Sequence, residues 1–586
     1  MIALAAVAFA TGAIFGAGHH SSPAQSLAAR FVQAWTKSDY ATMYDDIDAA
    51  SQRALSPSSF AAAYQAAATT ATTVRTTVAG SPRSMSDGTI VVPVRVRTRL
   101  FGTLRASFSL KVLADAQGPR VAWSKALVFP GLRPGESLTR HTTLPPRAAL
   151  LARDGSVLAG GPALAAGVRG SPLGAAADAV VGEIGPIPST RLGELEAQGV
   201  PSEAIIGTSG LERALDARLR GTPGGELLAG GRVLAEALAR APAPVRTTVS
   251  PSVQQAAATA LGGQLGGIVA IAPATGQILA VAGIGIDDLQ PPGSTFKMVT
   301  LTGVLQAKIA DAGTVFPYAT STTLDGVKLE NANGEECGGS LALAFAVSCN
   351  SVFAPLGVKL GAARLVATAE EFGFNHDPGV PGAVESTIPP ASGIEGELAL
   401  GSTAIGQGEV QASALEMATV AATIADGGRR PTATFTSDAA PSAGQTAGRV
   451  ISADVARTVR RLMIGVVRSG TGTSAAIPGV VVAGKTGTAE LGTPRCQSKG
   501  EQGPGREAGA NGESPSNEEP EAKSGSEGET SCQTAAKDPH NTDAWFAAFA
   551  PALHPRIVVA VLLVRDGAGG ETAAPVARQV LEAGLR

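Results

Sequence analysis

Three short polar motifs, which lie between residues 294 and 488, constrain the fold of this chain more than any other feature. In chain order they are Ser294-Thr-Phe-Lys297, Ser348-Cys-Asn350 and Lys485-Thr-Gly-Thr488. A single Ser-x-x-Lys pattern is weak evidence, because about one or two are expected by chance in a chain of this length. Here each pattern occurs once. If the motifs act together, the chain must fold so that their side chains share one cleft.

The residue types within these motifs suit nucleophilic catalysis by serine. Pro291-Pro-Gly293 can end a loop and start a helix, which would put Ser294 at the positive N-terminal end of that helix. Lys297 then lies on the same helical face, within reach of the Ser294 hydroxyl. A lysine can take the proton of a serine only when its amine is neutral. Burial and a second nearby cation both favour the neutral amine, and Lys485 could be that cation.

The phrases around the motifs carry a family resemblance. They are Pro291-Pro-Gly before Ser294, Ser-Cys-Asn-Ser at 348–351, Ala404-Ile-Gly-Gln-Gly408 and Ala483-Gly-Lys-Thr-Gly-Thr-Ala-Glu490. With the order and spacing of the motifs, they resemble the transpeptidase domain of class B penicillin-binding proteins. The resemblance implies attack on a D-alanyl-D-alanine stem peptide, loss of the terminal D-alanine and transfer of the acyl group to an amine on a neighbouring strand. It also implies that β-lactams acylate Ser294.

The resemblance implies a role for each motif residue. Ser348 would relay a proton to the leaving amine, and Asn350 would orient Lys297 and the substrate amide. The backbone N–H groups of Ser294 and Thr488 would form the oxyanion hole. Taken singly, these serines would more often be helix caps than catalysts, but the ordered set of three motifs reverses that interpretation.

The third motif is expected to form an edge strand that holds the terminal carboxylate of the substrate. Its residues are Lys485, Thr486, Gly487 and Thr488, of which Gly487 would keep the backbone clear. The segment Gly406-Gln-Gly408 is interpreted as a structural turn rather than as part of the chemistry.

Two phrases before this domain resemble the pedestal, often called the dimerisation domain, of the same proteins. The first runs from Arg147 to Gly155 and has Ala148 and Ala152 where Gly and Asp are typical, which departs from the family's turn and salt-bridge pattern. The second is Gly207-Thr-Ser-Gly-Leu-Glu-Arg213, followed by Leu219-Arg-Gly-Thr-Pro-Gly224, and matches closely.

The first part of the chain predicts a small α+β domain. Apolar residues at three- and four-residue steps indicate a helix from Ala24 to about Thr36, and Ser58 or Ser59 suits the N-cap of a second helix. Strand-like patterns follow over residues 92–99, 108–112 and 121–129. This layout suits an α+β cone. It resembles the nuclear-transport-factor-like domain at the front of some Gram-positive penicillin-binding proteins, where a spacer role is expected.

The segment Met1–Ala17 is uncharged and almost entirely apolar. Its length is about the lower limit for a membrane-spanning helix. A signal peptide and a signal anchor would both normally have a basic flank, which is missing, so the true start could lie upstream. A buried helix is a third interpretation, although the polar stretch His19–Ser22 follows directly. We expect export, with residues 1–18 retained as a single-pass membrane anchor and the catalytic domains outside the cytoplasm.

Export would allow disulfides to persist. The four cysteines form two sequence-near pairs, Cys337/Cys349 and Cys496/Cys532, although four cysteines allow three pairings. Cys349 could instead be a small buried residue beside the active site. The Glu-, Gly-, Ser- and Pro-rich tract over about 492–541 lacks apolar periodicity and predicts a disordered loop insertion in a sheet. A Cys496–Cys532 bond would close the base of that loop and contribute roughly 3–4 kcal/mol.

From Thr248 onward the pattern predicts an α/β domain. Apolar runs at 268–272 and 278–282 flank Pro273-Ala-Thr-Gly276, which indicates a hairpin. Further strands are expected at 543–549 and 557–564, and a closing helix at 573–583.

The chain is therefore expected to be a multidomain α+β protein. Its parts are a membrane anchor (1–18), a cone-like spacer domain (24–130), an elongated pedestal (131–247) and a transpeptidase domain (248–586) with an antiparallel sheet flanked by helices. A net charge of −3 gives no basic footprint for nucleic acid. The six histidines do not fall into metal-ligand spacings, so neither a metal nor another cofactor is expected.

The expected partners are peptidoglycan stem peptides, β-lactams and the membrane. No segment long enough for a glycosyltransferase precedes the pedestal, so a separate membrane glycan polymerase is expected as a further partner. A β-lactamase or a β-lactam sensor would share the fold, but both usually lack the pedestal, and the sequence shows no dedicated water-activating carboxylate. A catalytically silent cell-wall scaffold is a third possibility, against which the intact motifs argue.

Overall fold

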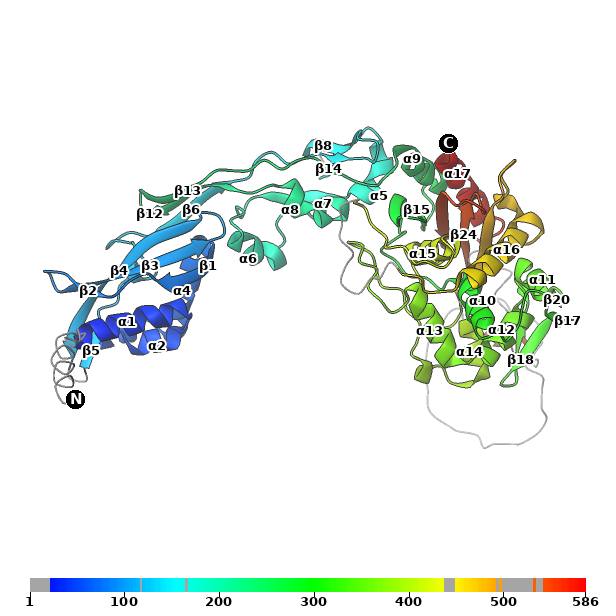
Figure 1. The fold of residues 1–586 in the computed structure, drawn as a ribbon, viewed down its shortest axis with the longest axis horizontal. Helices are drawn as coiled ribbons and strands as arrows, with labels where there is room; N and C mark the ends of the chain where they lie inside the picture. Colours follow the sequence, from blue (N-terminus) through cyan, green and yellow to red (C-terminus); the bar gives the residue numbers. More distant parts are fainter. Residues whose placement is uncertain are drawn as a thin grey trace, which may run out of the picture.

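A computed structural model describes residues 22–115, 118–163, 167–436, 448–491, 495–497, 531–533 and 541–586. These residues form an arch, with a small N-terminal domain at one end, a larger C-terminal domain at the other and an extended segment of short strands and helices between them (Figure 1). The predicted anchor (1–18) and most of the predicted insertion (492–541) lie outside the described residues. Among the described helices, no single one has both the length and the apolar character to cross a membrane. One bent pair, α12 (Asn350–Leu360) with α13 (Ala362–Phe372), meets that criterion jointly, with an angle of 100° between its halves.

The N-terminal domain packs four helices against one face of an antiparallel sheet. The helices are α1 (Pro23–Thr36), α2 (Tyr40–Asp45), α3 (Ala49–Ala54) and α4 (Pro57–Thr70). The strands run in the order β1 (Thr73–Val78), β3 (Thr89–Thr98), β4 (Thr103–Asp115) and β5 (Gly118–Val121), with β2 (Arg83–Ser84) paired to β3. Alternation along β3 buries Val92, Val94 and Val96 against the helices. The rings of Trp35 and Phe108 meet edge to face in this core.

The helix predicted over residues 24–36 is confirmed by α1. The predicted start of the second helix is wrong: Ser56, not Ser58 or Ser59, is the N-cap, and its hydroxyl accepts a hydrogen bond from the backbone N–H of Ser59. Pro57 explains the difference, because proline suits the first helical position. The strand predicted over 121–129 is also wrong, since β5 ends at Val121 and a 3-10 turn, η1 (Lys125–Leu127), follows.

The central segment is elongated. One sheet has the order β13 (Arg232–Ala237), β12 (Gly224–Ala229), β6 (Leu138–Thr143), and a second has the order β14 (Val245–Arg246), β7 (Leu150–Leu151), β8 (Val157–Ala163), β9 (Arg169–Gly170). The smaller elements are η2 (Gly174–Ala177), α5 (Asp178–Val181), β10 (Ile184–Pro186), α6 (Ser189–Ala197), β11 (Ile205–Gly207), α7 (Gly210–Ala214) and α8 (Asp216–Leu219).

A buried ion-pair cluster joins the two phrases that the sequence analysis singled out in this segment. Arg147 contacts Glu212 at 2.7 Å and Asp216 at 2.8 Å, and the fully buried Arg169 contacts Glu212 at 2.6 Å. The atypical Ala148 takes part through its backbone oxygen, which accepts a hydrogen bond from Arg169 at 2.7 Å. Each buried charge therefore has an opposite charge beside it, which offsets the cost of removing it from water.

The C-terminal domain is built on a five-stranded antiparallel sheet. Its order is β16 (Gln277–Gly283), β15 (Gly266–Ala272), β25 (Ile557–Leu563), β24 (Thr542–Ala550), β21 (Ala483–Glu490). The hairpin, the two late strands and the closing helix expected from the sequence are confirmed by β15 with β16, by β24 and β25, and by α17 (Ala573–Leu585). The edge strand β21 carries the third motif.

Helices cover both faces of this sheet. On one face α9 (Pro251–Leu261) and α17 pack against the strands. On the other face α15 (Ala414–Ala425) is buried along its whole length, as expected for a helix that is mostly apolar, with Glu416 as its one charged residue. Of the remaining helices, α10 (Lys297–Gln306), α13 and α16 (Ala453–Ser469) pack against α15. The same domain also contains α11 (Leu341–Ala346), α12 and α14 (Gly396–Ala404), with the short strands β17 (Val315–Ala319), β18 (Ser321–Leu324), β19 (Val327–Glu330) and β20 (Cys337–Ser340).

The buried ion-pair cluster gives a testable prediction for Glu212→Gln. This change keeps the side-chain shape but removes the charge that faces Arg147 and Arg169, so it should destabilise the central segment by about 3–5 kcal/mol. Hydrogen exchange of the peptide that covers residues 205–219, followed by mass spectrometry, measures this loss. The matched control is Glu136→Gln, which removes a more exposed ion pair with Arg232 and should change exchange little. Equal protection in both variants would contradict the prediction.

Candidate active site

The nucleophile candidate Ser294 lies in a short 3-10 turn, η3 (Gly293–Phe296), that leads directly into α10. Gly293 has φ +50°, and a Cβ atom there would lie 2.7 Å from the backbone oxygen of Thr488. Its N–H donates to the backbone oxygen of Gly406 at 2.9 Å. Gly406 lies in a turn, as the sequence analysis interpreted it. Only glycine permits this approach, so the turn and β21 together fix the position of Ser294.

The second motif joins α11 to α12, with Asn350 as the first residue of α12. Ser348 has φ +62°, a backbone conformation that residues other than glycine rarely adopt and that is found disproportionately at active sites. The amide of Asn350 is oriented from the other side, because its Nδ2 donates to the backbone oxygen of Glu330 at 3.0 Å. This leaves Oδ1 of Asn350 facing the first motif.

Lys297 is fully buried and lies against the second motif. Its Nζ donates to the backbone oxygen of Ser348 at 2.7 Å and to Oδ1 of Asn350 at 2.6 Å, and it lies 3.3 Å from Oγ of Ser348. Within the described residues no hydrogen bond joins this amine to the Ser294 hydroxyl. The first and second motifs therefore meet through Lys297.

Lys485 approaches the same hydroxyl from the sheet. Its Nζ donates to Oγ of Ser348 at 2.9 Å and to the backbone oxygen of Thr486 at 3.0 Å. Lys485 is also fully buried. Residues of all three motifs, far apart in the sequence, are thus neighbours in the structure, and both amines lie within hydrogen-bonding distance of Ser348 Oγ.

The environment of the two lysines favours their neutral forms. Burial, and secondly the charge of Lys485, hold the pKa of Lys297 well below its usual value. Burial lowers the pKa of Lys485 to about 7. The rings of Phe353 and Phe345 lie 5.7 and 5.5 Å from the respective amines and form part of the apolar surroundings. A neutral lysine amine is the form that can accept a proton.

The rest of the third motif is held by residues that the sequence analysis did not single out. The hydroxyl of Thr486 lies 2.6 Å from that of Thr471, and the N–H of Gly569 donates to Oγ1 of Thr488 at 3.4 Å. At Gly487 a Cβ atom would lie 2.8 Å from the backbone oxygen of Pro292. The Ser-Gly-Thr-Gly run that contains Thr471 was a weak signal of a turn, and its contact with β21 depends on the tertiary structure.

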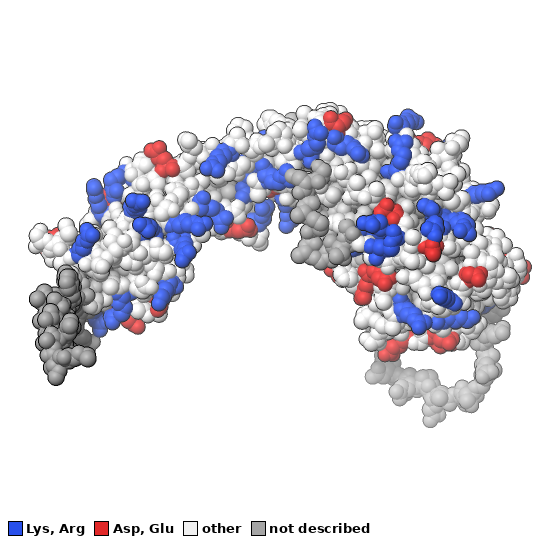
Figure 2. Space-filling model, viewed as in Figure 1, with Lys and Arg blue, Asp and Glu red and all other residues white. Residues whose placement is uncertain are grey.

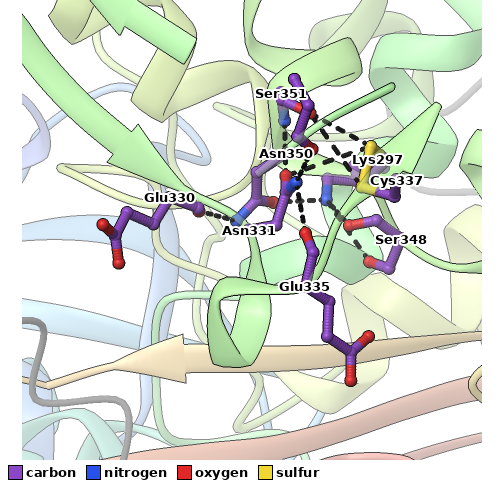
Figure 3. Close-up of a disulfide and its surroundings, with 10 residues drawn as sticks. Lys297, Glu330, Asn331, Glu335, Cys337, Ser348, Asn350 and Ser351 are labelled. Atoms are coloured by element: carbon purple, nitrogen blue, oxygen red, sulfur yellow. Dashed lines mark hydrogen bonds between the residues drawn. A yellow bond between two sulfur atoms is a disulfide. The ribbon is translucent and has the colours of Figure 1, made fainter. Parts of the chain in front are cut away.

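A disulfide reinforces the second motif. Cys337 at the start of β20 is bonded to Cys349, which lies between Ser348 and Asn350 (Figure 3). This settles one of the pairings that the sequence left open. Cys496 and Cys532 are opposite one another in the backbone register of β22 (Arg495–Gln497) and β23 (Ser531–Gln533), and their disulfide stays a prediction.

Two acidic residues border this region. Glu330 and Glu335 contribute backbone oxygens to the asparagine side chains Asn350 and Asn331. Figure 3 shows that their carboxylates point away from Lys297 and Ser348. They therefore position the motif through the backbone and do not face the buried amines.

Comparison with protein families divides the chain into three parts. The penicillin binding protein transpeptidase domain matches residues 266–503 and 499–582. The NTF2-like N-terminal transpeptidase domain matches residues 23–136, and the penicillin-binding protein dimerisation domain matches residues 163–242.

Individual relatives come from the same family as these domain matches. The chain is similar to peptidoglycan D,D-transpeptidase PbpA of Mycolicibacterium smegmatis, with 34% identity over 452 residues that cover 65% of this chain and 80% of the relative. It is also similar to PbpA of Mycobacterium tuberculosis, with 32% identity over 447 residues and the same coverage.

Solved structures show the same fold. The penicillin G acyl-enzyme complex of penicillin-binding protein A from M. tuberculosis has 28% sequence identity and a TM-score of 0.54, over 75% of this chain and 100% of that chain. The D,D-transpeptidase domain of a peptidoglycan glycosyltransferase from Eggerthella lenta has 29% identity and a TM-score of 0.54, over 75% and 98%.

Two buried lysines around one serine hydroxyl, at the edge of an antiparallel sheet, define a serine acyltransferase of the penicillin-recognising fold. The transpeptidase match covers more than half of the chain, and the chain belongs to the penicillin-binding protein transpeptidase family. It has the mixed α/β fold of that family, preceded by a dimerisation domain and an NTF2-like domain. The family and its NTF2-like first domain, as predicted from the sequence, are confirmed.

The pKa values of the lysines predict a bell-shaped pH dependence for acylation by penicillin. Lys297 accepts a proton only above its lowered pKa, so the rate should rise with pH on the acid side. In the free enzyme Lys485 is charged only below its pKa of about 7, so the rate should fall at higher pH. Lys485→Arg keeps a charge that does not titrate near pH 7, so the pH at which the rate falls on the alkaline side should move to a higher value. Stopped-flow measurement of acylation tests this, and an unshifted limb in the variant would refute it.

The disulfide gives a second prediction. Cys337→Ser frees the turn that holds Ser348 and Asn350, and a small misplacement there should slow acylation about 10- to 100-fold. Loss of the cross-link should also lower the free energy of unfolding by up to about 3 kcal/mol. Rates are measured with a fluorescent penicillin. A reductant should reproduce the defect in the native protein and have no effect on the variant; full activity after reduction would count against a positioning role.

Proposed function

We propose that this chain is a peptidoglycan D,D-transpeptidase that cross-links stem peptides through an acyl-enzyme on Ser294. The observation that carries the proposal is the convergence of Lys297 and Lys485 on the hydroxyl of Ser348. The names of the relatives and the acyl-enzyme complex of a similar structure support the same reaction.

The first half of the reaction forms the acyl-enzyme. Oγ of Ser294 attacks the carbonyl carbon of the penultimate D-alanine, and its proton passes to the neutral amine of Lys297. The N–H groups of Ser294 and Thr488 stabilise the oxyanion of the tetrahedral intermediate. The C–N bond then breaks, and the leaving D-alanine amine receives a proton through Ser348. An ester on Ser294 remains.

The second half transfers the acyl group. An amine of a neighbouring stem peptide attacks the ester carbonyl, loses a proton to the base, and expels Oγ of Ser294, which regains a proton. An amide joins the two peptides and the free enzyme is restored. Lys485, Thr486 and Thr488 on β21 would bind the terminal carboxylate of the donor, and Gly487 lets β21 lie against the backbone of Pro292 beside Ser294.

The orientation of the hydroxyl of Ser348 follows from the two lysines. A neutral Lys297 has a lone pair and can accept a hydrogen bond from Ser348, while a charged Lys485 can only donate to it. Ser348 would then be able to pass a proton from Lys297 towards the leaving amine. This arrangement supports its role as the relay.

The same proposal includes the location of the protein, the roles of its domains and its partners. Residues 1–18 would anchor the chain in the membrane by a single pass, with the other domains outside the cytoplasm. The chain would consist of a spacer domain (24–130), a pedestal (131–247) and a transpeptidase domain (248–586), and would use glycan strands made by a separate membrane polymerase. β-Lactams would bind as mimics of the donor peptide. A β-lactamase or sensor, and a silent scaffold, are the alternatives.

Mass spectrometry of the protein after incubation with penicillin G tests the proposal. We expect a covalent adduct on the peptide that contains Ser294, and none in Ser294→Ala with its fold intact by circular dichroism. Ser252→Ala, on the helix α9 that covers the opposite face of the sheet, should still be labelled. Release of the adduct within hours supports a transferase and within seconds a hydrolase, whereas complete absence of labelling would indicate a scaffold.

A further inference from the structure

The N-terminal domain is basic although the chain is not. Residues 23–136 contain thirteen Lys and Arg and seven Asp and Glu, a net charge of +6, whereas the whole chain carries −3. The remaining residues therefore carry −9. Figure 2 shows that Lys and Arg predominate over Asp and Glu on the visible side of this domain. Such an asymmetry between parts of one chain is a sign of an anionic partner for the basic part.

Four arginines lie together on one face of the N-terminal sheet. In the strand register Arg75 of β1 is opposite Arg97 of β3, and Arg95 of β3 is opposite Arg105 of β4. All four side chains are exposed, because the alternate residues of β3 point into the core on the other side. We call these four residues the arginine face. It spans three adjacent strands, which lie about 5 Å apart.

The arginine face is not neutralised within the chain. Among the described residues, none of its four side chains forms an ion pair or a hydrogen bond. In β1, β3 and β4 the single acidic residue is Asp115, at the far end of β4. Like charges directly opposite each other destabilise a sheet. Two such pairs side by side thus weaken the domain unless an anion binds them.

The surface between the strands is hollowed at this place. A groove of about 230 Å³ is lined by Arg95 and Arg105, with Pro93, Ser107 and Ala79 beside them. Guanidinium groups bind phosphate through two parallel hydrogen bonds, which makes arginine the preferred residue for this ligand. A narrow groove with a cation on each of two strands suits a chain of phosphate groups.

We propose that the arginine face binds a linear phosphodiester polymer of the cell envelope. The groove favours a slender chain over the flat surface of a bilayer. Helix α1 also lies on the opposite, core side of the sheet, so the chain enters the domain from the side away from the arginines. This inference rests on the proposed function, which locates the domain outside the cytoplasm. That location excludes nucleic acid as the physiological ligand. The NTF2-like domain would then hold the enzyme against an anionic wall polymer while the C-terminal domain acts.

Binding of the full chain in detergent to fluorescent poly(glycerol phosphate) tests this inference. We expect binding that weakens steeply with salt, because exposed charges are screened. Arg95→Glu/Arg105→Glu should lower the affinity at least tenfold. Lys37→Glu/Arg53→Glu is the matched control: it makes the same change in charge at exposed positions of the helical layer and should leave the affinity within about twofold.

Two further measurements separate this inference from its alternatives. Arg95→Gln should raise the melting temperature, because it removes repulsion from Arg105. Weaker binding of the polymer by this variant would then not result from unfolding. Penicillin labelling of Ser294 should be unchanged in every variant, which keeps the outcome distinct from that of the proposed transpeptidase. Equal loss of binding in both double variants, or binding to phosphatidylglycerol vesicles but not to the polymer, would overturn the inference.

Discussion

The hydroxyl of Ser348 lies between two buried amines, and the rest of the structure depends on that arrangement. Lys297 and Lys485 are both excluded from water, and each lies within hydrogen-bonding distance of the same oxygen. Two ammonium groups so close in a buried environment repel one another, and each is also poorly solvated. Loss of a proton from one of the two amines removes the repulsion and also the cost of burying that charge. Lys297, which would be charged in water, is thereby held in the form that can accept a proton.

Such a site requires a rigid support. Each amine comes from a different element, Lys297 from α10 and Lys485 from β21, and the turn at Ser348 has an unfavourable backbone conformation that its surroundings must hold. The disulfide to Cys337 on one side and the close approach of Gly293 to β21 on the other provide this support. The buried helix α15 and the five-stranded sheet hold these parts together.

The outer parts of the arch differ in how their charged side chains are arranged. In the central segment the ion pairs of Arg147 and Arg169 with Glu212 join residues distant in sequence, and removal of one partner would leave buried charge behind. At the far end the N-terminal domain keeps arginines opposite arginines at a cost in stability. The central segment thus pairs its buried charges, whereas the exposed arginines of the N-terminal sheet face one another across the strands.

The sequence by itself predicted the candidate catalytic residues, because the residue types and order of the three motifs carry that information. It also determined the regular elements with clear periodicity, such as α1 and the β15–β16 hairpin. The start of α4 and the end of β5 were predicted wrongly, although Pro57 and a 3-10 turn decide them locally. The partner of Cys349, the contact between Thr471 and Thr486, and the pairing of Arg95 with Arg105 were decided only by the tertiary structure. Each depends on which distant segments become neighbours, and this is fixed by the packing of the whole core, whereas helices, turns and motifs depend on residues only a few positions apart.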